Sequence, residues 1–259
     1  ARFDGLNFTV FDKENTPAFK SNDIRFLVED RQGRLWISTS YGLVYRHNGE
    51  FKSFTVNEGL PDNSIGPVVE DTSGKIWIGT AGGLTRFDNG NFKTLTAEQG
   101  LSRNVIQTLC ARADGSVLVG TSAGMQSLRD EHFSSFELPQ YVNVANVTAI
   151  AETGDRKVWF GTPDGLVVVS GPASALLTLS NNRVNALRMD RAGALWVATS
   201  GGVVRVNNGG TETFTATDGL SSNLVLSVYE DREGSIWIGT EAGGLNLLKS
   251  KKFNTYSTR

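Results

Sequence analysis

The sequence predicts an all-β fold, a β-propeller built from four-stranded antiparallel blades. The first observation is a tryptophan-centred string, GKIWIGTAGGL at 74–84, which recurs in similar form at 33–43, 193–203 and 234–245. The second is its spacing, since successive units are 41 residues apart, with one interval of 37. The third is that each unit contains four short strand signals and no useful helical periodicity. Repeats of this length with four strands each are typical of propeller blades.

Six units share this frame, and we expect them to form a single propeller domain over 1–259. The blades are centred near Trp36, Trp77, Leu118, Trp159, Trp196 and Trp237. A threonine follows each of these positions three residues later, and a turn glycine comes after it. We expect the tryptophan side chain to fill the space between adjacent blades, and the threonine hydroxyl to form a hydrogen bond with a neighbouring backbone group. The string is therefore interpreted as blade structure, because no helix and no P-loop lysine follows it.

The second unit shows the four expected strands in order. Residues 63–71 are mostly apolar and β-branched, which predicts a first strand. After a TSG turn, 75–80 alternate in polarity and predict the second strand. An AGG turn leads to the third strand at 84–88, and an Asn-Gly pair, a strong hairpin signal, leads to the fourth at 91–96.

An asparagine precedes the first strand in five units, and eight residues after it comes an acidic or turn position, usually aspartate. These asparagines are Asn22, Asn63, Asn104, Asn182 and Asn223. Both residue types satisfy backbone donors in turns, so we assign them to the scaffold. Residues 1–12 resemble the third and fourth strands of a blade. They form either a closing strand on the last blade of a six-bladed ring or a partial blade belonging to a seven-bladed one.

Composition and charge exclude several classes of function. The net charge is −2 with acidic and basic residues interspersed, so we expect no nucleic-acid partner. No apolar run approaches the roughly 20 residues that span a bilayer. Cys110 is the only cysteine and lies in an apolar strand, so it is expected to be a buried thiol. His47 and His132 are expected to be exposed, and catalytic and metal-ligand motifs are absent, so we expect no enzyme activity, metal or cofactor.

The pattern GLxxN…ED…G-x-[IL]-W-I-G-T…GGL, read from 59–84 and 219–248, resembles the two-component regulator propeller repeat. The resemblance covers nearly the whole chain and implies an extracytoplasmic sensor module of a bacterial regulator, in the periplasm, with a downstream output domain. Members of this family sense carbohydrate fragments or act as protein-docking modules. The third unit departs from the pattern, with Leu118 for tryptophan and Arg112 for aspartate, and the fourth lacks the glycine of the turn that precedes its tryptophan. These blades have either drifted or carry a partner-binding face.

A binding site is expected where the loops between blades and the second-to-third strand loops share one end of the blades, since loops on a rigid scaffold commonly bind ligands. The candidate residues are Arg25, Gln107 and Asn185 on first strands, Arg103 and Arg183 just before them, and Tyr41 and Asp164 in loops. Arginine and aromatic side chains suit sugars and carboxylates. We therefore expect a sensor for a small molecule, such as an oligosaccharide. The alternatives are a protein-docking scaffold, a homodimer and, least favoured, a propeller lyase or hydrolase.

Overall fold

The structure is a computed structural model that describes residues 1–4, 6–136, 147–170, 173–177, 183–207, 209–249 and 252–256. The chain divides into two compact units, Ala1–Glu137 and Leu138–Arg259, and each is described by itself. Among the predicted scaffold residues, Asn182 lies outside the described residues.

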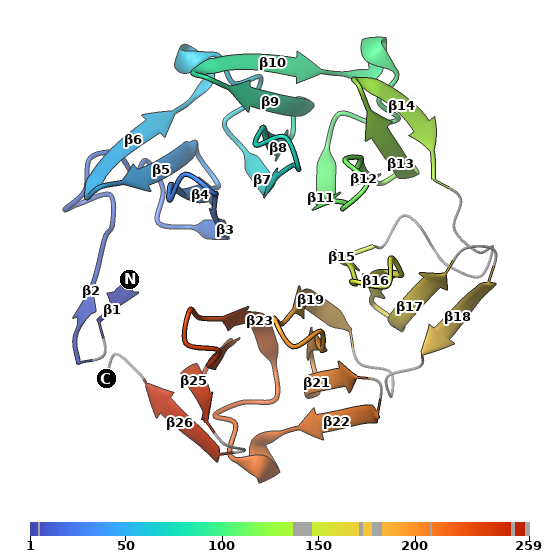
Figure 1. Cartoon of the computed structure of the whole chain (residues 1–259). Coiled ribbons are helices and arrows are strands. Elements are labelled where there is room, and N and C mark those ends of the chain that lie inside the picture. The colour runs from blue at the N-terminus through green and yellow to red at the C-terminus, as the bar shows by residue number, and fades with distance from the viewer. Residues whose placement is uncertain are drawn as a thin grey trace. The chain divides into compact units, whose positions relative to one another are not determined.

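The first unit contains a short N-terminal hairpin and three blades (Figure 1). The hairpin is β1 (Arg2–Phe3) and β2 (Phe8–Thr9). Blade 1 contains β3 (Ile24–Glu29), β4 (Leu35–Thr39), β5 (Leu43–His47) and β6 (Glu50–Phe54). Blade 2 contains β7 (Ile65–Glu70), β8 (Ile76–Thr80), β9 (Leu84–Asp88) and β10 (Asn91–Leu95). Blade 3 contains β11 (Ile106–Ala111), β12 (Val117–Thr121), β13 (Gly124–Arg129) and β14 (His132–Ser135).

The second unit contains three further blades (Figure 1). Blade 4 contains β15 (Ala149–Glu152), β16 (Val158–Thr162), β17 (Gly165–Ser170) and β18 (Ala173–Leu177). Blade 5 contains β19 (Val184–Met189), β20 (Leu195–Thr199), β21 (Gly202–Asn207) and β22 (Gly210–Phe214). Blade 6 contains β23 (Val225–Glu230), β24 (Ile236–Thr240), β25 (Gly244–Lys249) and β26 (Lys252–Tyr256).

Each blade is an antiparallel sheet whose four strands pair in chain order. The predicted fold class is therefore confirmed: the chain is an all-β propeller of six four-stranded blades. The N-terminal hairpin is a two-stranded sheet of its own, in which Arg2 is opposite Thr9 and Phe3 is opposite Phe8. All four strands of blade 6 come from 225–256, and the N-terminal hairpin forms a partial sheet of its own.

The tryptophan of one blade packs against the next blade, as expected from the sequence. Trp36 lies in one apolar cluster with Ile65, Ile76 and Phe87 of blade 2. The same arrangement joins Trp77 to blade 3 and Trp196 to blade 6. Because each ring fills the seam between two sheets, the core of the molecule is a series of interblade clusters.

The aspartate at the end of the first strand holds this ring in place. The indole Nε1–H donates to an aspartate oxygen in the pairs Trp36–Asp30, Trp77–Asp71, Trp196–Asp190 and Trp237–Asp231, at 2.7–2.8 Å. Burial by itself would raise the pKa of Asp30, but hydrogen bonds from Trp36 and Arg34 outweigh it and lower that pKa. The carboxylate therefore stays ionised inside the seam.

Blades 3 and 4 lack this pair. In blade 3, Leu118 and Arg112 replace the tryptophan and the aspartate together. In blade 4 the tryptophan remains, but Thr153 stands at the aspartate position, and the buried Nε1 of Trp159 has no hydrogen-bond partner among the described residues. The two irregular repeats thus differ from the others in one shared structural feature.

The remaining scaffold predictions concern the opposite end of the blades, where the second strand ends. Each threonine hydroxyl donates to the carbonyl of the following turn glycine, as between Thr199 and Gly202 at 2.8 Å. Gly202 has a φ of +131°, and a Cβ on it would lie 2.4 Å from the carbonyl oxygen of Phe214. The asparagine prediction is also confirmed, since Asn63 Oδ1 accepts from the backbone N–H of Val56 at 3.0 Å.

Within the described part of the chain, three 3-10 turns, which the strand pattern did not predict, lead into blades 2, 3 and 6. They are η1 (Val56–Glu58), η2 (Ala97–Gln99) and η4 (Ala216–Asp218). A threonine caps each one, and the side chain of the third residue of the turn accepts a hydrogen bond from the backbone N–H of that threonine. Cys110 is buried on β11, as predicted.

Candidate functional site

The three predicted first-strand residues lie at one kind of structural position. Arg25, Gln107 and Asn185 each stand where the register between the first and second strands shifts by one residue. A bulge of this kind turns a side chain away from its regular alternation. These residues occupy matching positions in the sequence repeats, and in the structure each of them lies at a β-bulge.

Two of these bulge side chains bind the neighbouring blade. Arg25 donates to the hydroxyl of Ser64 at 3.0 Å and to the carbonyl of Ile65 at 3.3 Å. Asn185 Nδ2 donates to the carbonyl of Val225 at 2.7 Å. Both acceptors at the next first strand occupy the same repeat position, so Arg25 and Asn185 connect adjacent blades. Gln107 is exposed on β11.

The other four predicted residues are exposed in loops at the end of the blades that carries the threonine–glycine turns. Tyr41 and Arg103 belong to the first unit, and Asp164 and Arg183 to the second. The backbone N–H of Asp164 donates to the hydroxyl of Thr162, and the backbone carbonyl of Arg183 accepts from the N–H of Ser200. Within the described residues, no hydrogen bond or ion pair joins any two of the seven predicted site residues.

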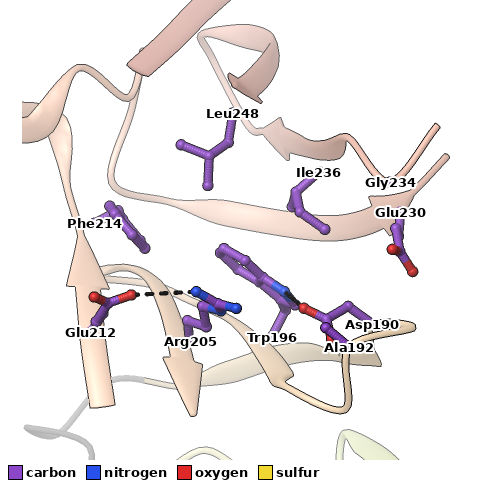
Figure 2. Close-up of a pocket in the computed structure, with 10 residues that line it drawn as sticks. All are labelled: Asp190, Ala192, Trp196, Arg205, Glu212, Phe214, Glu230, Gly234, Ile236 and Leu248. Atoms are coloured by element: carbon purple, nitrogen blue, oxygen red, sulfur yellow. Dashed lines mark hydrogen bonds and ion pairs between the residues drawn. The ribbon is translucent and has the colours of Figure 1, made fainter. Parts of the chain in front are cut away.

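A cleft of about 260 Å³ lies in the second unit between blades 5 and 6 (Figure 2). We call it the blade 5–6 cleft. Blade 5 contributes Asp190, Ala192, Trp196, Arg205, Glu212 and Phe214. Blade 6 contributes Glu230, Gly234, Ile236 and Leu248. The lining therefore comes from two sheets that meet along one seam.

An aromatic and cationic wall forms the blade 5 side of the cleft. The rings of Trp196 and Phe214 are stacked with their centroids 6.1 Å apart. The guanidinium of Arg205 lies 5.5 Å from the centre of the Trp196 ring, and its Nη1 is 3.7 Å from a carboxylate oxygen of Glu212. Figure 2 shows Arg205 between Glu212 and the indole. This arrangement combines a flat apolar surface with a charge pair whose net charge is zero.

Two further carboxylates border the cleft. Asp190 Oδ2 accepts from the Trp196 indole at 2.8 Å, and its Oδ1 accepts from the backbone N–H of Ala194 at 2.8 Å. Glu230 of blade 6 accepts from the backbone N–H of Arg191 at 2.8 Å, which ties the two blades together. Three carboxylates thus face one arginine, so the lining carries a net charge of −2.

The cleft lies at the other end of the blades from the predicted loops. Asp190 directly follows β19, and Trp196 is the second residue of β20, so both lie beside the turn between the first and second strands. Thr199 ends β20 at the other end, where the loops gather. None of the seven predicted residues lines it. The sequence of a single repeat could not reveal the cleft, because its walls come from two blades.

The described residues contain neither a cluster of metal ligands nor a membrane-spanning helix. No group of three or more His, Cys, Asp or Glu residues among them is arranged to hold a metal ion. No helix in the described part of the chain has the length and apolar character needed to cross a membrane.

Comparison with protein families decides the nature of the repeats. The model of the two-component regulator propeller matches residues 18–41, 59–82, 178–201 and 219–242. The chain carries two-component regulator propeller repeats. The matched repeats are those of blades 1, 2, 5 and 6. The unmatched ones are blades 3 and 4, which lack the tryptophan–aspartate pair. Curated proteins give no match to the chain.

Solved structures with the same fold include proteins of different functions. The extracellular domain of a hybrid two component system from B. thetaiotaomicron is 22% identical, with a TM-score of 0.76, and the alignment covers 92% of this chain and 35% of that one. Virginiamycin B lyase from Staphylococcus aureus is 14% identical, with a TM-score of 0.72, over 90% of this chain and 84% of the lyase. PorZ of Porphyromonas gingivalis, a surface component of the type-IX secretion system, is 17% identical, with a TM-score of 0.64, over 86% and 38%.

These proteins share the propeller fold with this chain. Because their sequence identities are low, the similarity shows a common fold and no common function. The chain spans about a third of the extracellular domain of the two component system. Four segments of the chain thus match the two-component regulator propeller repeat, while the fold itself also occurs in a lyase.

Proposed function

We propose that this chain is the non-catalytic sensing part of a bacterial signal-transduction regulator, on the extracytoplasmic side of the membrane. The observation that supports the proposal most is the match of four blades to the two-component regulator propeller repeat. A structurally similar protein is the extracellular domain of a hybrid two component system. In this proposal a small molecule binds the propeller, and a downstream domain carries the output.

The blade 5–6 cleft supplies a route from binding to signal. Its walls belong to two sheets, and Trp196 of blade 5 is buried against Val225 and Ile238 of blade 6. A ligand held between these walls contacts both sheets at once. Binding would then favour one packing of blade 6 on blade 5, and a downstream domain that contacts blade 6 would respond to that change.

A protein-docking scaffold is the second candidate, favoured by one observation in the first unit. Ile24, Phe26 and Leu27 of β3 are 43%, 42% and 61% exposed, although they are large apolar side chains on one strand. Exposed apolar clusters often mark protein contacts. A lyase activity is not part of the proposal, because His132 is exposed on β14 and its Nδ1 lies 2.8 Å from the backbone carbonyl oxygen of Asp130.

Thermal unfolding of the chain in the presence of oligosaccharides, amino acids, organic acids and amines tests the proposal. A sensor should be stabilised by one chemical class, by about 2.7 kcal/mol at a ligand concentration 100 times the dissociation constant. The same compound should change the output of the full-length regulator. The docking alternative predicts no stabilisation by any compound, and binding of a protein partner that is lost in the double variant Phe26→Ser, Leu27→Ser.

A further inference from the structure

The seam between blades 1 and 2 contains the same arrangement as the blade 5–6 cleft, but a side chain of the protein fills it. The two seams align with a shift of 160 residues, so that Trp36 corresponds to Trp196. In the blade 1–2 seam, Arg34 Nε donates to Asp30 Oδ2 at 2.6 Å. Its guanidinium lies 5.1 Å from the centre of the Trp36 ring and 5.7 Å from that of Phe87. A guanidinium is therefore the natural occupant of this space.

Two substitutions open the equivalent space between blades 5 and 6. Ala194 stands at the position of Arg34, and Leu248 pairs with Ile236 as Phe87 pairs with Ile76. The first change removes a whole guanidinium side chain, and the second replaces a ring by a smaller group. The indole and the aspartate that receive the guanidinium are kept, as Trp196 and Asp190. The cleft is thus the same seam without a guanidinium at the Arg34 position; the guanidinium that lies over the Trp196 ring is that of Arg205, at the position of Tyr45.

The charges of the two seams differ in the same sense. Asp30, Arg34, Lys52 and Glu70 give the blade 1–2 seam a net charge of zero. The corresponding set between blades 5 and 6 is Asp190, Ala194, Glu212 and Glu230, with Arg205 at the position of Tyr45. That set carries −2, because the loss of Arg34 and the change from Lys52 to Glu212 lower the charge by three and Arg205 raises it by one. Compared with the blade 1–2 seam, the blade 5–6 seam therefore contains less positive charge as well as less side-chain volume.

We propose that the blade 5–6 cleft binds the guanidinium group of a ligand, in the place that Arg34 occupies in the blade 1–2 seam. The planar cation would stack on the face of Trp196 and donate to Asp190 Oδ2, the interactions that Arg34 makes with Trp36 and Asp30. Glu212 lies next to Arg205 and offsets its repulsion of a second cation. This inference rests on the proposed function only in treating the ligand as the signal.

The size of the cleft limits how much of the ligand it holds. Its volume of about 260 Å³ is below the roughly 300–1,000 Å³ of pockets for drug-sized ligands. A group the size of an arginine side chain fits this volume, and an oligosaccharide does not. A planar guanidinium suits the flat indole better than a compact ammonium does, because it stacks and forms directed hydrogen bonds at the same time. The ligand is accordingly a compound with an arginine-like arm.

Calorimetric titration with agmatine and arginine amide tests the proposal. We expect a dissociation constant of about 1 mM, which corresponds to about −4.1 kcal/mol. Citrulline amide, the neutral isostere, and butylamine, a compact cation, should bind at least about 10-fold more weakly. The variant Ala194→Arg restores the internal guanidinium and should lose binding while remaining folded. Leu248→Phe should weaken binding, and Ala97→Arg, on an exposed turn of the first unit, should leave it unchanged.

Two results would overturn this assignment. One is the absence of binding of agmatine and arginine amide to the wild-type chain at 10 times the expected dissociation constant. The other is equal binding of these compounds to the wild-type chain and to Ala194→Arg. If one of these two results is found and a compound without a guanidinium stabilises the wild-type chain, the assignment of the cleft fails while the sensing function stands. The two proposals are therefore separated by the same set of measurements.

Discussion

The indole N–H of Trp36 donates to the carboxylate of Asp30 at 2.7 Å, across the turn that joins the first two strands of blade 1. The two residues are six positions apart, and pairs with the same spacing occur in blades 2, 5 and 6. The aspartate also caps its own turn, since Asp30 Oδ1 accepts from the backbone N–H groups of Gln32 and Arg34. One carboxylate thus fixes both the turn and the ring that fills the seam.

Removal of this carboxylate should destabilise the protein more than removal of a carboxylate that accepts no hydrogen bond from an indole. In Asp71→Ala, the buried indole of Trp77 and the backbone N–H groups of Ser73 and Lys75 lose their acceptor. We expect a loss of about 1–3 kcal/mol, the cost of an unsatisfied buried donor. Urea unfolding at pH 7 measures it. The control Asp88→Ala, on the third strand of the same blade, should cost less than about 0.5 kcal/mol, and equal losses would contradict the role of Asp71.

The same carboxylate predicts a pH dependence. Burial by itself would raise the pKa of Asp71, but hydrogen bonds from Ser73 and Trp77 outweigh it and lower the pKa below the ordinary value of 3.8. A group with a lowered folded-state pKa stabilises the protein above the unfolded-state pKa, and this contribution is lost as the pH falls through the folded-state pKa. The stability difference between the wild-type protein and Asp71→Asn should therefore shrink below about pH 4. A difference that is constant between pH 7 and pH 3 would contradict this linkage.

Blade 4 offers the reverse experiment. The Nε1 of Trp159 is buried without a partner among the described residues, and Thr153 stands six residues before it. Thr153→Asp should supply the missing acceptor and stabilise the chain by about 1 kcal/mol. The gain should disappear in the Trp159→Phe background, because phenylalanine has no donor. Thermal and urea unfolding of the four proteins gives the coupling, and a gain that persists without the indole would show that it has another origin.

The bulge residues separate a structural role from a binding role. Asn185 donates to the carbonyl of Val225 in the next blade, whereas Gln107 occupies the matching bulge of blade 3 and is exposed. Asn185→Ala should lower the free energy of unfolding by about 1 kcal/mol, and Gln107→Ala should leave it almost unchanged. If Asn185→Ala unfolds like the wild type but loses ligand binding, the residue contributes to the site that the sequence predicted.

The sequence was sufficient for features that recur in every unit. The spacing of Trp36 and Trp77 predicted the blades, and the threonine–glycine pairs predicted the turns, because backbone constraints repeat with the fold. The N-terminal hairpin was predicted as a strand pair, but its pairing required coordinates. The 3-10 turns were missed, although Thr96 followed by Gln99 has the spacing of a capping box.

The candidate site was harder to predict for a physical reason. Reasoning from single blades selected exposed polar residues on loops, such as Tyr41 and Arg183, and their role in binding stays a prediction. The blade 5–6 cleft depends on side chains from two repeats and on what is missing from them. A comparison of Arg34 with Ala194 in the aligned repeats contains the signal, but it has meaning only once the seam of blades 1 and 2 shows where Arg34 lies.

The indole signals of the five tryptophans test the account most directly. In a ¹H–¹⁵N spectrum each Nε1–H gives one resonance, and Trp196→Phe identifies that of Trp196 by its loss. On addition of agmatine, the account predicts that the Trp196 resonance moves with a saturable concentration dependence while that of Trp36, whose seam Arg34 already fills, stays in place. A Trp196 resonance that does not move, or equal movement of both, would contradict it.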